Sequence, residues 1–229
     1  MPIIKDDEFG DITVRRSQVS RQVRISVAPN GKLRASMPPY TPMIFLKKLI
    51  KSSRDELRQM IEKSRPETNY FNGQAIGKKH SLIIQTGQVE SVVKRRNMIV
   101  ATVKDGTDIN SSGILDELRG AVIKSLRSEA KDYLPKRLNQ LAQEMGCSYE
   151  RVRFSHASSR WGSCSSTGTI SLNIALMKLP FELIDYVIIH ELAHTVQMNH
   201  SSDFWDIVRQ YDSAYKQHRN VLKSETPSI

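Results

Sequence analysis

The chain has 229 residues, a formal net charge of +10 and an isoelectric point near 9.7. This length allows one elaborate domain or two small ones, and no apolar run approaches the length of a membrane span. Acidic residues at positions 1–11 exclude a secretory signal there, so we expect a cytoplasmic protein. The only two cysteines, Cys147 and Cys164, form no CxxC pair and indicate reduced, partly buried thiols.

The N-terminal third alternates apolar and polar residues or carries β-branched ones, a pattern typical of half-buried strands. We expect residues 1–11 to be frayed and residues 29–31 to form a tight turn. These strands carry the densest arginine cluster of the chain, which is either a solvated face or a surface that contacts phosphates. The candidate phosphate ligands are Arg15, Arg16 and Arg24. The expected strands are Ile12–Arg16, Gln22–Ala28 and Lys32–Met37.

A long helix is expected next, over residues 41–64, because Pro42 suits a first helical turn and Pro66 follows the last apolar residue. A second β-rich block follows this helix. Within it, His80 stands beside two lysines, which indicates a surface histidine rather than a ligand. The expected strands of this block are Gln74–Ile76, Ser81–Gln85, Val89–Lys94 and Asn97–Val103.

A polar stretch at residues 105–112 indicates a domain boundary. We expect an α+β protein in which residues 1–111 form a β-rich N-terminal module with one long helix, and residues 112–229 form a mainly helical region. The elements expected in this region are an amphipathic helix over residues 114–145 with a kink or break at Pro135, strands at 151–155 and 168–174, a buried helix opened by Pro180, a last helix after Ser201 or Ser202, and a disordered tail from Ser224.

Three of the six histidines lie between residues 190 and 200. His190 and His194 are spaced i, i+4, so on a helix they project from one face about one turn apart. Glu191 lies one step round the helix, where its carboxylate can reach a water molecule held by a shared ion. This is the HExxH arrangement, in which two neutral imidazoles bind Zn²⁺ and the glutamate takes a proton from the bound water.

The third histidine, His200, would lie about 15 Å along the axis from His190 if the helix ran straight. We therefore expect the helix to stop between Thr195 and Asn199, with Asn199 in the left-handed conformation that ends many helices. Three protein ligands with one open position are typical of catalytic zinc, whereas closed four-ligand sites are structural. The sequence thus predicts one metal ion per chain, zinc or another divalent ion, with Glu191 as general base.

The C-terminal half resembles the YgjP-like family of zinc metallopeptidases, which is related to the WLM and SprT-type proteases. The resemblance implies a zincin-like catalytic unit in which the hairpin from Arg160 to Asn173 lies beside the motif helix and offers an edge strand to an extended peptide. The candidate substrate-contacting residues of this hairpin are Arg160, Trp161, Ser163 and Asn173. The stretches that carry the resemblance are Arg160–Ser165, Gly168–Asn173, Asp185–His194, and Asn199–Ser201 with Phe204 and Trp205.

The sequence is also compatible with two other functions. The same activated water could attack a phosphoanhydride, making the chain a nucleoside-triphosphate pyrophosphatase whose arginines hold the nucleotide. The positive charge also allows a nucleic-acid-binding protein with a structural metal, although a solvated basic surface explains that charge more simply. The leading hypothesis is metal-dependent hydrolysis of peptides or unfolded proteins.

Overall fold

The structure is a computed structural model that describes residues 2–28, 32–64, 69–111 and 113–229. The chain divides into two compact units, Met1–Glu67 and Thr68–Ile229. Sheets and helices occur in both units, which confirms the α+β class. The boundary expected between residues 111 and 112 falls inside the second unit, because the strands that precede it pack on the helix that follows it.

A four-stranded sheet in the order β1-β2-β4-β3 forms the first unit. Strand β2 is antiparallel to β1 and parallel to β4, and β3 is antiparallel to β4. The first strand forms where a frayed terminus was expected, because Ile4 is buried in the core and the backbone pairs with β2. The turn expected at residues 29–31 lies outside the described residues. The strands are β1 (Ile3–Asp6), β2 (Gly10–Arg16), β3 (Arg24–Val27) and β4 (Leu33–Met37).

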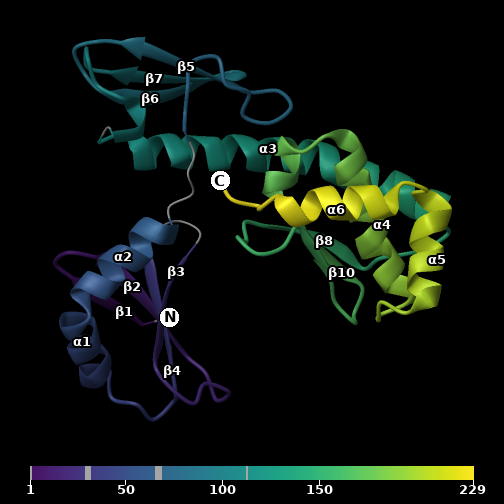
Figure 1. Ribbon diagram of the computed structural model, residues 1–229, viewed down its shortest axis with the longest axis horizontal. Helices are drawn as coiled ribbons and strands as arrows, with labels where there is room; N and C mark the ends of the chain where they lie inside the picture. The colour runs from purple at the N-terminus through teal and green to yellow at the C-terminus, as the bar shows by residue number, and fades with distance from the viewer. Residues whose placement is uncertain (1, 29–31, 65–68, 112) are drawn as a thin grey trace. The chain divides into compact units, whose positions relative to one another are not determined.

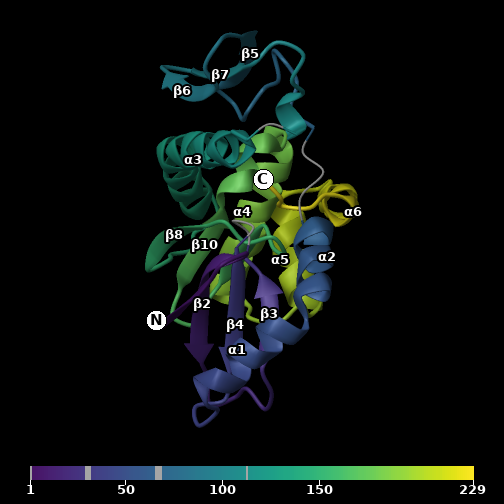
Figure 2. The same cartoon turned by 90° about the vertical axis from the view of Figure 1, so that its left-hand side faces the viewer.

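Two helices, α1 (Met43–Ser52) and α2 (Arg54–Ser64), cover one face of this sheet (Figure 2). One continuous helix was expected, but the chain leaves helical geometry at Ser53 (φ −112°, ψ 27°). Neither proline nor glycine marks that point in the sequence. The expected end of the helix at Pro66 lies outside the described residues. The core between sheet and helices contains Ile12, Val14, Leu33, Ala35, Met37, Leu46, Ile50 and Leu57.

In the second unit, a three-stranded sheet in the order β5-β7-β6 packs on the long helix α3 (Leu115–Glu144), as Figure 1 shows. The first strand expected in this block is only an isolated bridge between Ala75 and Ser81. A short 3-10 helix, η1 (Ile109–Ser111), precedes α3. The strands are β5 (Ser81–Thr86), β6 (Ser91–Arg95) and β7 (Met98–Val103).

Helix α3 continues through Pro135 without a break. Leu134 and Leu138 on either side are fully buried, and their packing outweighs the hydrogen bond that proline cannot donate. The carbonyl left without this bond belongs to Lys131, an exposed residue that water can reach. The chain leaves the helix at Gly146, whose φ of 62° suits a glycine.

His80 is buried, with 8% of its surface exposed, and not at the surface as expected. The loop that carries it wraps around the carboxylate of Glu129 in α3, which accepts the backbone N–H groups of Lys78, Lys79 and His80 at 2.6, 3.0 and 3.1 Å. The His80 ring contacts the same carboxylate through Nδ1. Adjacent lysines suggested exposure, but a buried carboxylate needs several donors and draws the loop inward.

A second three-stranded sheet, in the order β8-β10-β9, lies beside the helices of the C-terminal part. Strand β10 is parallel to β8 and antiparallel to β9, so β9 is an edge strand. The expected hairpin between residues 160 and 173 is thus present. The elements are β8 (Arg151–Ser155), β9 (Gly162–Cys164), β10 (Thr169–Asn173), the 3-10 helix η2 (Ile174–Lys178), α4 (Phe181–Val196), α5 (Ser202–Tyr211) and α6 (Tyr215–Ser224).

The C-terminal tail is packed and not disordered as expected. Pro227 and Ile229 are buried, and Lys178 donates a hydrogen bond from Nζ to the carbonyl of Ser228 at 3.0 Å. Apolar contact with the core holds this short segment, which its composition alone does not reveal. Across the described ranges of the chain, no helix combines the length and the apolar character that crossing a membrane requires.

Candidate metal centre

Helix α4 carries the first two histidines into the interior because it is apolar almost all round. Ile184, Ile188 and Leu192 have no exposed surface, and the helix packs against α3, α5, α6 and strand β9. Pro180 precedes the first turn, as expected. His190 and His194 therefore lie one turn apart on a helix that its neighbours hold in place.

The helix ends at Val196, inside the expected window, and the chain turns so that His200 returns to the two helical histidines. The end is made by Gln197 in an extended conformation (φ −132°, ψ 107°). Asn199 does not adopt the left-handed conformation that was expected. Its Oδ1 instead accepts the backbone N–H of Ser201 at 3.2 Å, since an asparagine side chain can close a turn without a positive φ.

The three histidines form the only group of at least three potential ligands that the described residues bring together, with ligand atoms within 4.8 Å of one another. Nε2 of His190 and Nε2 of His200 are 3.2 Å apart. Two nitrogens that bind one tetrahedral zinc at about 2.0–2.1 Å would be separated by about 3.3 Å. The spacing fits a shared ion.

Hydrogen bonding and burial prepare these imidazoles as ligands. Nδ1 of His194 lies 3.2 Å from the carbonyl of Gln197, an arrangement that orients the ring and leaves Nε2 for a metal. Burial, together with the neighbouring imidazoles, lowers the pKa of His190 to about 3, and burial also lowers the pKa of His194. Both rings are therefore neutral near pH 7, which is the form that binds metal.

Aromatic side chains of α5 enclose the ligands. The Phe204 ring lies 4.5 Å from the His194 ring and 4.9 Å from the His190 ring, measured between centroids. Trp205 stacks on His200 at 5.6 Å. These contacts limit the rotamers of the three imidazoles, so the ligand set is preorganised by packing.

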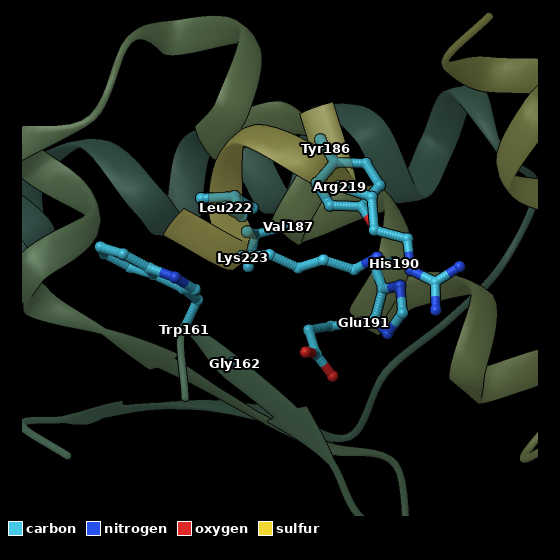
Figure 3. Close-up of a pocket in the computed structure, with 9 residues that line it drawn as sticks. All are labelled: Trp161, Gly162, Tyr186, Val187, His190, Glu191, Arg219, Leu222 and Lys223. Carbon is cyan, nitrogen blue, oxygen red and sulfur yellow. The ribbon is translucent and has the colours of Figure 1, made fainter. Parts of the chain in front are cut away.

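Glu191 lies between the histidines and the edge strand β9, with 6% of its surface exposed. Burial raises the pKa of this carboxyl to about 8, and the positive charge of Arg160 acts in the opposite direction. A Cβ atom added to Gly162 of β9 would lie 2.6 Å from Oε1 of Glu191. The strand backbone thus packs directly against the carboxylate (Figure 3).

Cavities lined by described residues border the histidines, and two of them have a clear relation to the site. One, of 240 Å³, reaches His190 and Glu191, and the other, of 320 Å³, reaches His194. The first is lined by Trp161, Gly162, Tyr186, Val187, His190, Glu191, Arg219, Leu222 and Lys223. The second is lined by residues 148–150 and 165–168 with His194, Thr195 and Met198. The candidate metal site therefore borders open space at both His190 and His194.

The four candidate substrate residues of the hairpin have different surroundings. Trp161 lines the first cavity, and the exposed Arg160 is close enough for its charge to act on Glu191. Ser163 is half-buried in β9, where it pairs with Ser171. Asn173 has no exposed surface, and its amide donates to the carbonyls of Ala157 and Arg160 at 2.7 and 2.9 Å. Because it cannot reach a substrate in this structure, we assign Asn173 to positioning the 157–160 loop.

Helix α6 supplies residues that sequence reasoning missed. Arg219, Leu222 and Lys223 line the first cavity, and the Arg219 guanidinium lies 4.6 Å from the centre of the Trp205 ring. Their i, i+3 and i, i+4 spacing could have placed them on one helix face, but nothing in the sequence relates that face to the HExxH helix.

The strand arginines belong to the first unit and do not share one face. In register, Arg15, Ser36 and Arg24 form a row across β2, β4 and β3. Arg16 points to the opposite face, where its guanidinium donates to the carbonyl of Pro39. On the Arg15 face lies a groove of 480 Å³ that Arg15, Lys32 and Arg34 line together with hydroxyl groups.

The comparison with protein families agrees with the resemblance seen in the sequence. The model of the YgjP-like metallopeptidase domain matches residues 21–225. The metallopeptidase zymogen abylysin of Pyrococcus abyssi is 27% identical, with 42% of this chain and 98% of abylysin covered and a TM-score of 0.37. The metallopeptidase zymogen jannalysin of Methanocaldococcus jannaschii is 21% identical, with 38% and 91% covered and a TM-score of 0.35. None of the curated proteins compared with the chain matches it.

The family match spans most of the chain, and the histidine triad supplies a site suited to the metal of a metallopeptidase. The chain belongs to the YgjP-like family of metallopeptidase domains.

Proposed function

We propose that the chain is a zinc-dependent peptidase that hydrolyses extended segments of peptides or unfolded proteins, with Glu191 as general base. The observation that carries this proposal is the position of Glu191. Its carboxylate lies next to the histidine triad in sequence and against the backbone of Gly162 in space. It thus lies between the candidate metal ligands and the strand along which a peptide would bind.

His190, His194 and His200 would hold the ion. Three neutral nitrogen ligands suit zinc, and the lack of a fourth protein ligand within the described cluster leaves a position open for substrate or water. When bound, zinc supplies a Lewis acid that polarises the scissile carbonyl and makes water a stronger acid. Closed structural sites have four protein ligands, so a purely structural metal fits this set less well.

The edge strand β9 would hold the substrate backbone. An extended peptide can pair with the free edge of Gly162–Cys164, which fixes its main chain while alternate side chains enter neighbouring spaces. The cavities beside His190 and His194 can receive such side chains. This arrangement favours a polypeptide over a compact small molecule.

Glu191 would move the proton. Its carboxylate accepts a proton from the attacking water as the new carbon–oxygen bond forms at the scissile carbonyl. It then passes that proton to the amine nitrogen as the carbon–nitrogen bond breaks. The second proton of the water stays on the new carboxyl group until it ionises, and the amine takes it up, so the final products are a carboxylate and an ammonium group. The positive charge of Arg160 favours the carboxylate form and so opposes the effect of burial, which raises the pKa of this group to about 8.

The test is the Glu191→Gln variant, which keeps the size of the side chain and removes its basicity. We expect one zinc per chain in both proteins, and loss of hydrolysis of an unfolded protein substrate by a factor of about 100 or more in the variant. Glu182→Gln, an exposed position in the first turn of the same helix, is the matched control and should keep full activity. Full activity in zinc-loaded Glu191→Gln would exclude this mechanism.

A second candidate, a nucleoside-triphosphate pyrophosphatase, is favoured by one observation, the basic groove on the sheet of the first unit. Guanidinium and hydroxyl groups in one groove are suitable phosphate ligands. Incubation of the zinc-loaded protein with the common nucleoside triphosphates tests this function by release of pyrophosphate. Hydrolysis of unfolded protein without pyrophosphate release would exclude it.

A further inference from the structure

The 240 Å³ cavity beside His190 combines an apolar wall with cations that have no acidic partner. Trp161, Val187 and Leu222 supply the wall. Arg219 and Lys223 lie one turn apart on α6, and neither forms an ion pair with a carboxylate in the described part of the chain; Lys223 Nζ reaches only Oδ1 of Asn220, at 3.4 Å. The cavity volume suits one side chain, being below the roughly 300–1,000 Å³ of sites for larger ligands.

The guanidinium of Arg219 is held near the candidate metal ligands by packing. The Arg219 guanidinium lies over Trp205, which in turn stacks on the candidate ligand His200. Its charge also contributes to lowering the pKa of His190, which reflects how near it lies. Figure 3 shows Trp161 and Arg219 on opposite sides of the cavity, with Lys223 between them.

The charges in the cavity are asymmetric. Among the described residues that line it, Glu191 is the single acidic one and faces Gly162, whereas Arg219 and Lys223 enter from α6. Helix α6 contains no acidic residue, and the nearby Asp212 is already paired with His218, from Nδ1 to Oδ2 at 2.7 Å. A negative group in this cavity would therefore be attracted toward α6.

We propose that this cavity is a substrate subsite for a residue with an apolar stem and a carboxylate tip, and that Arg219 and Lys223 select the carboxylate. The proposal rests on the peptidase function above and adds a substrate class to it. The carboxylate has two sources, an aspartate or glutamate side chain next to the scissile bond, or the C-terminal carboxylate of the substrate. Both present the same planar anion, which a guanidinium and an ammonium group bind by charge-assisted hydrogen bonds.

The kinetic test uses zinc-loaded full-length protein and fluorogenic peptides that differ only at one position next to the cleaved bond, with glutamate, glutamine or leucine there. A leucine peptide with a free C-terminus is compared with its amide to separate the two sources. We expect kcat/KM for one carboxylate-bearing peptide to exceed that of its neutral counterpart by about tenfold or more. Arg219→Gln with Lys223→Gln should bring this ratio close to one.

Lys216→Gln is the matched control, because it removes a charge from the same helix outside the cavity and should preserve the ratio. An unchanged ratio in the double variant would overturn the proposal. An equal loss of activity on every peptide would also overturn it, because the cations would then act on the reaction in general and not on the carboxylate.

A binding measurement separates this proposal from the peptidase function. Acetylated tripeptide amides with glutamate, glutamine or leucine in the middle, and the free acid of the leucine peptide, are titrated into zinc-loaded Glu191→Gln protein. Binding is followed by the fluorescence of Trp161 and Trp205. Preference for a carboxylate that disappears in the Arg219→Gln, Lys223→Gln background supports the subsite even if no peptide is hydrolysed. Equal affinity for all four peptides would refute the subsite even if hydrolysis is observed.

Discussion

Gly162 of the edge strand β9 is in direct contact with the side chain of Glu191 of helix α4. A Cβ atom at position 162 would lie 2.6 Å from Oε1, 2.8 Å from Cγ and 2.9 Å from Cδ of Glu191. Real Cβ contacts are essentially never shorter than 3.0 Å, and the glutamate is buried, so its whole side chain would have to move. The glycine is needed here because strand and helix approach closely.

Gly162→Ala should therefore reduce activity while zinc binding persists. The added methyl group displaces the carboxylate from its position beside the histidines, and a displacement of about 1 Å can cost about 100-fold in rate. We expect kcat to fall by about tenfold to 100-fold and stability to fall by about 1–3 kcal/mol from overpacking. Steady-state kinetics and zinc content, measured on the same preparation, check this expectation.

Gly120→Ala is the control for that variant. Gly120 lies inside helix α3, and a Cβ atom there meets no other atom within 4 Å. Alanine should stabilise the helix by up to about 1 kcal/mol and leave kcat unchanged. If Gly162→Ala were as active as Gly120→Ala, the contact with Glu191 would have no part in catalysis.

His200→Ala should weaken zinc binding strongly. Loss of even a supporting partner of a ligand costs about 10- to 100-fold in affinity, so loss of one of three ligands should cost more than about 100-fold. The measurement is competition against a chelator of known affinity. His156→Asn, outside the ligand cluster, should retain the affinity of the unchanged protein. Equal zinc affinity for His200→Ala and the unchanged protein would remove His200 from the ligand set.

The buried carboxylate of Glu129 should be one of the larger contributors to the stability of the second unit. It accepts three backbone N–H groups from residues 78–80, and in Glu129→Gln an amide NH₂ would face some of these donors. We expect the free energy of unfolding to fall by about 3–5 kcal/mol. Urea denaturation followed by circular dichroism measures it. The exposed Glu117→Gln, in the first turn of the same helix, should cost no more than about 1 kcal/mol.

Asp185 pairs with Arg137 of α3 in a two-bond arrangement, with both bonds at 2.8 Å, and does not contact an imidazole. About a quarter of each side chain is exposed, so solvent screening limits the contribution of this ion pair to the free energy of unfolding to about 1 kcal/mol. A double-mutant cycle with Asp185→Asn and Arg137→Gln should give a coupling energy of this size. Zinc affinity should not change in either single variant, and a clear loss would mean that the pair also orients a ligand.

Acid should destabilise the protein partly through His156. Burial, and then the charge of Arg127, lowers the pKa of this histidine below 6.5 in the folded state. The unfolded chain therefore binds a proton more readily, so this contribution is complete above about pH 6.5 and is lost as the pH falls below it. The free energy of unfolding should decrease less between pH 7 and pH 5 in His156→Asn than in the unchanged protein. Identical pH profiles by urea denaturation would contradict this assignment.

Local sequence patterns were enough to predict the candidate metal site. The spacing of His190 and His194 implies a shared helix face, and the distance to His200 requires the helix to end first. Both follow from helix geometry alone. The apolar character of residues 183–196 predicted burial of that helix. The end of the helix was placed correctly, but its local conformation was not, because Gln197 makes the turn.

Contacts between segments that are distant in the sequence could not be predicted from these local patterns. Nothing local indicates that Glu129 draws the loop at His80 inward, or that Gly162 packs on Glu191. Helix α6 similarly reaches the first cavity only through tertiary packing. The periodicity of apolar residues shows which side of a helix or strand is apolar, because the geometry of that element alone decides which of its residues share a face. Which elements then meet depends on the packing of the whole core, so only the tertiary structure decided what surrounds the HExxH helix.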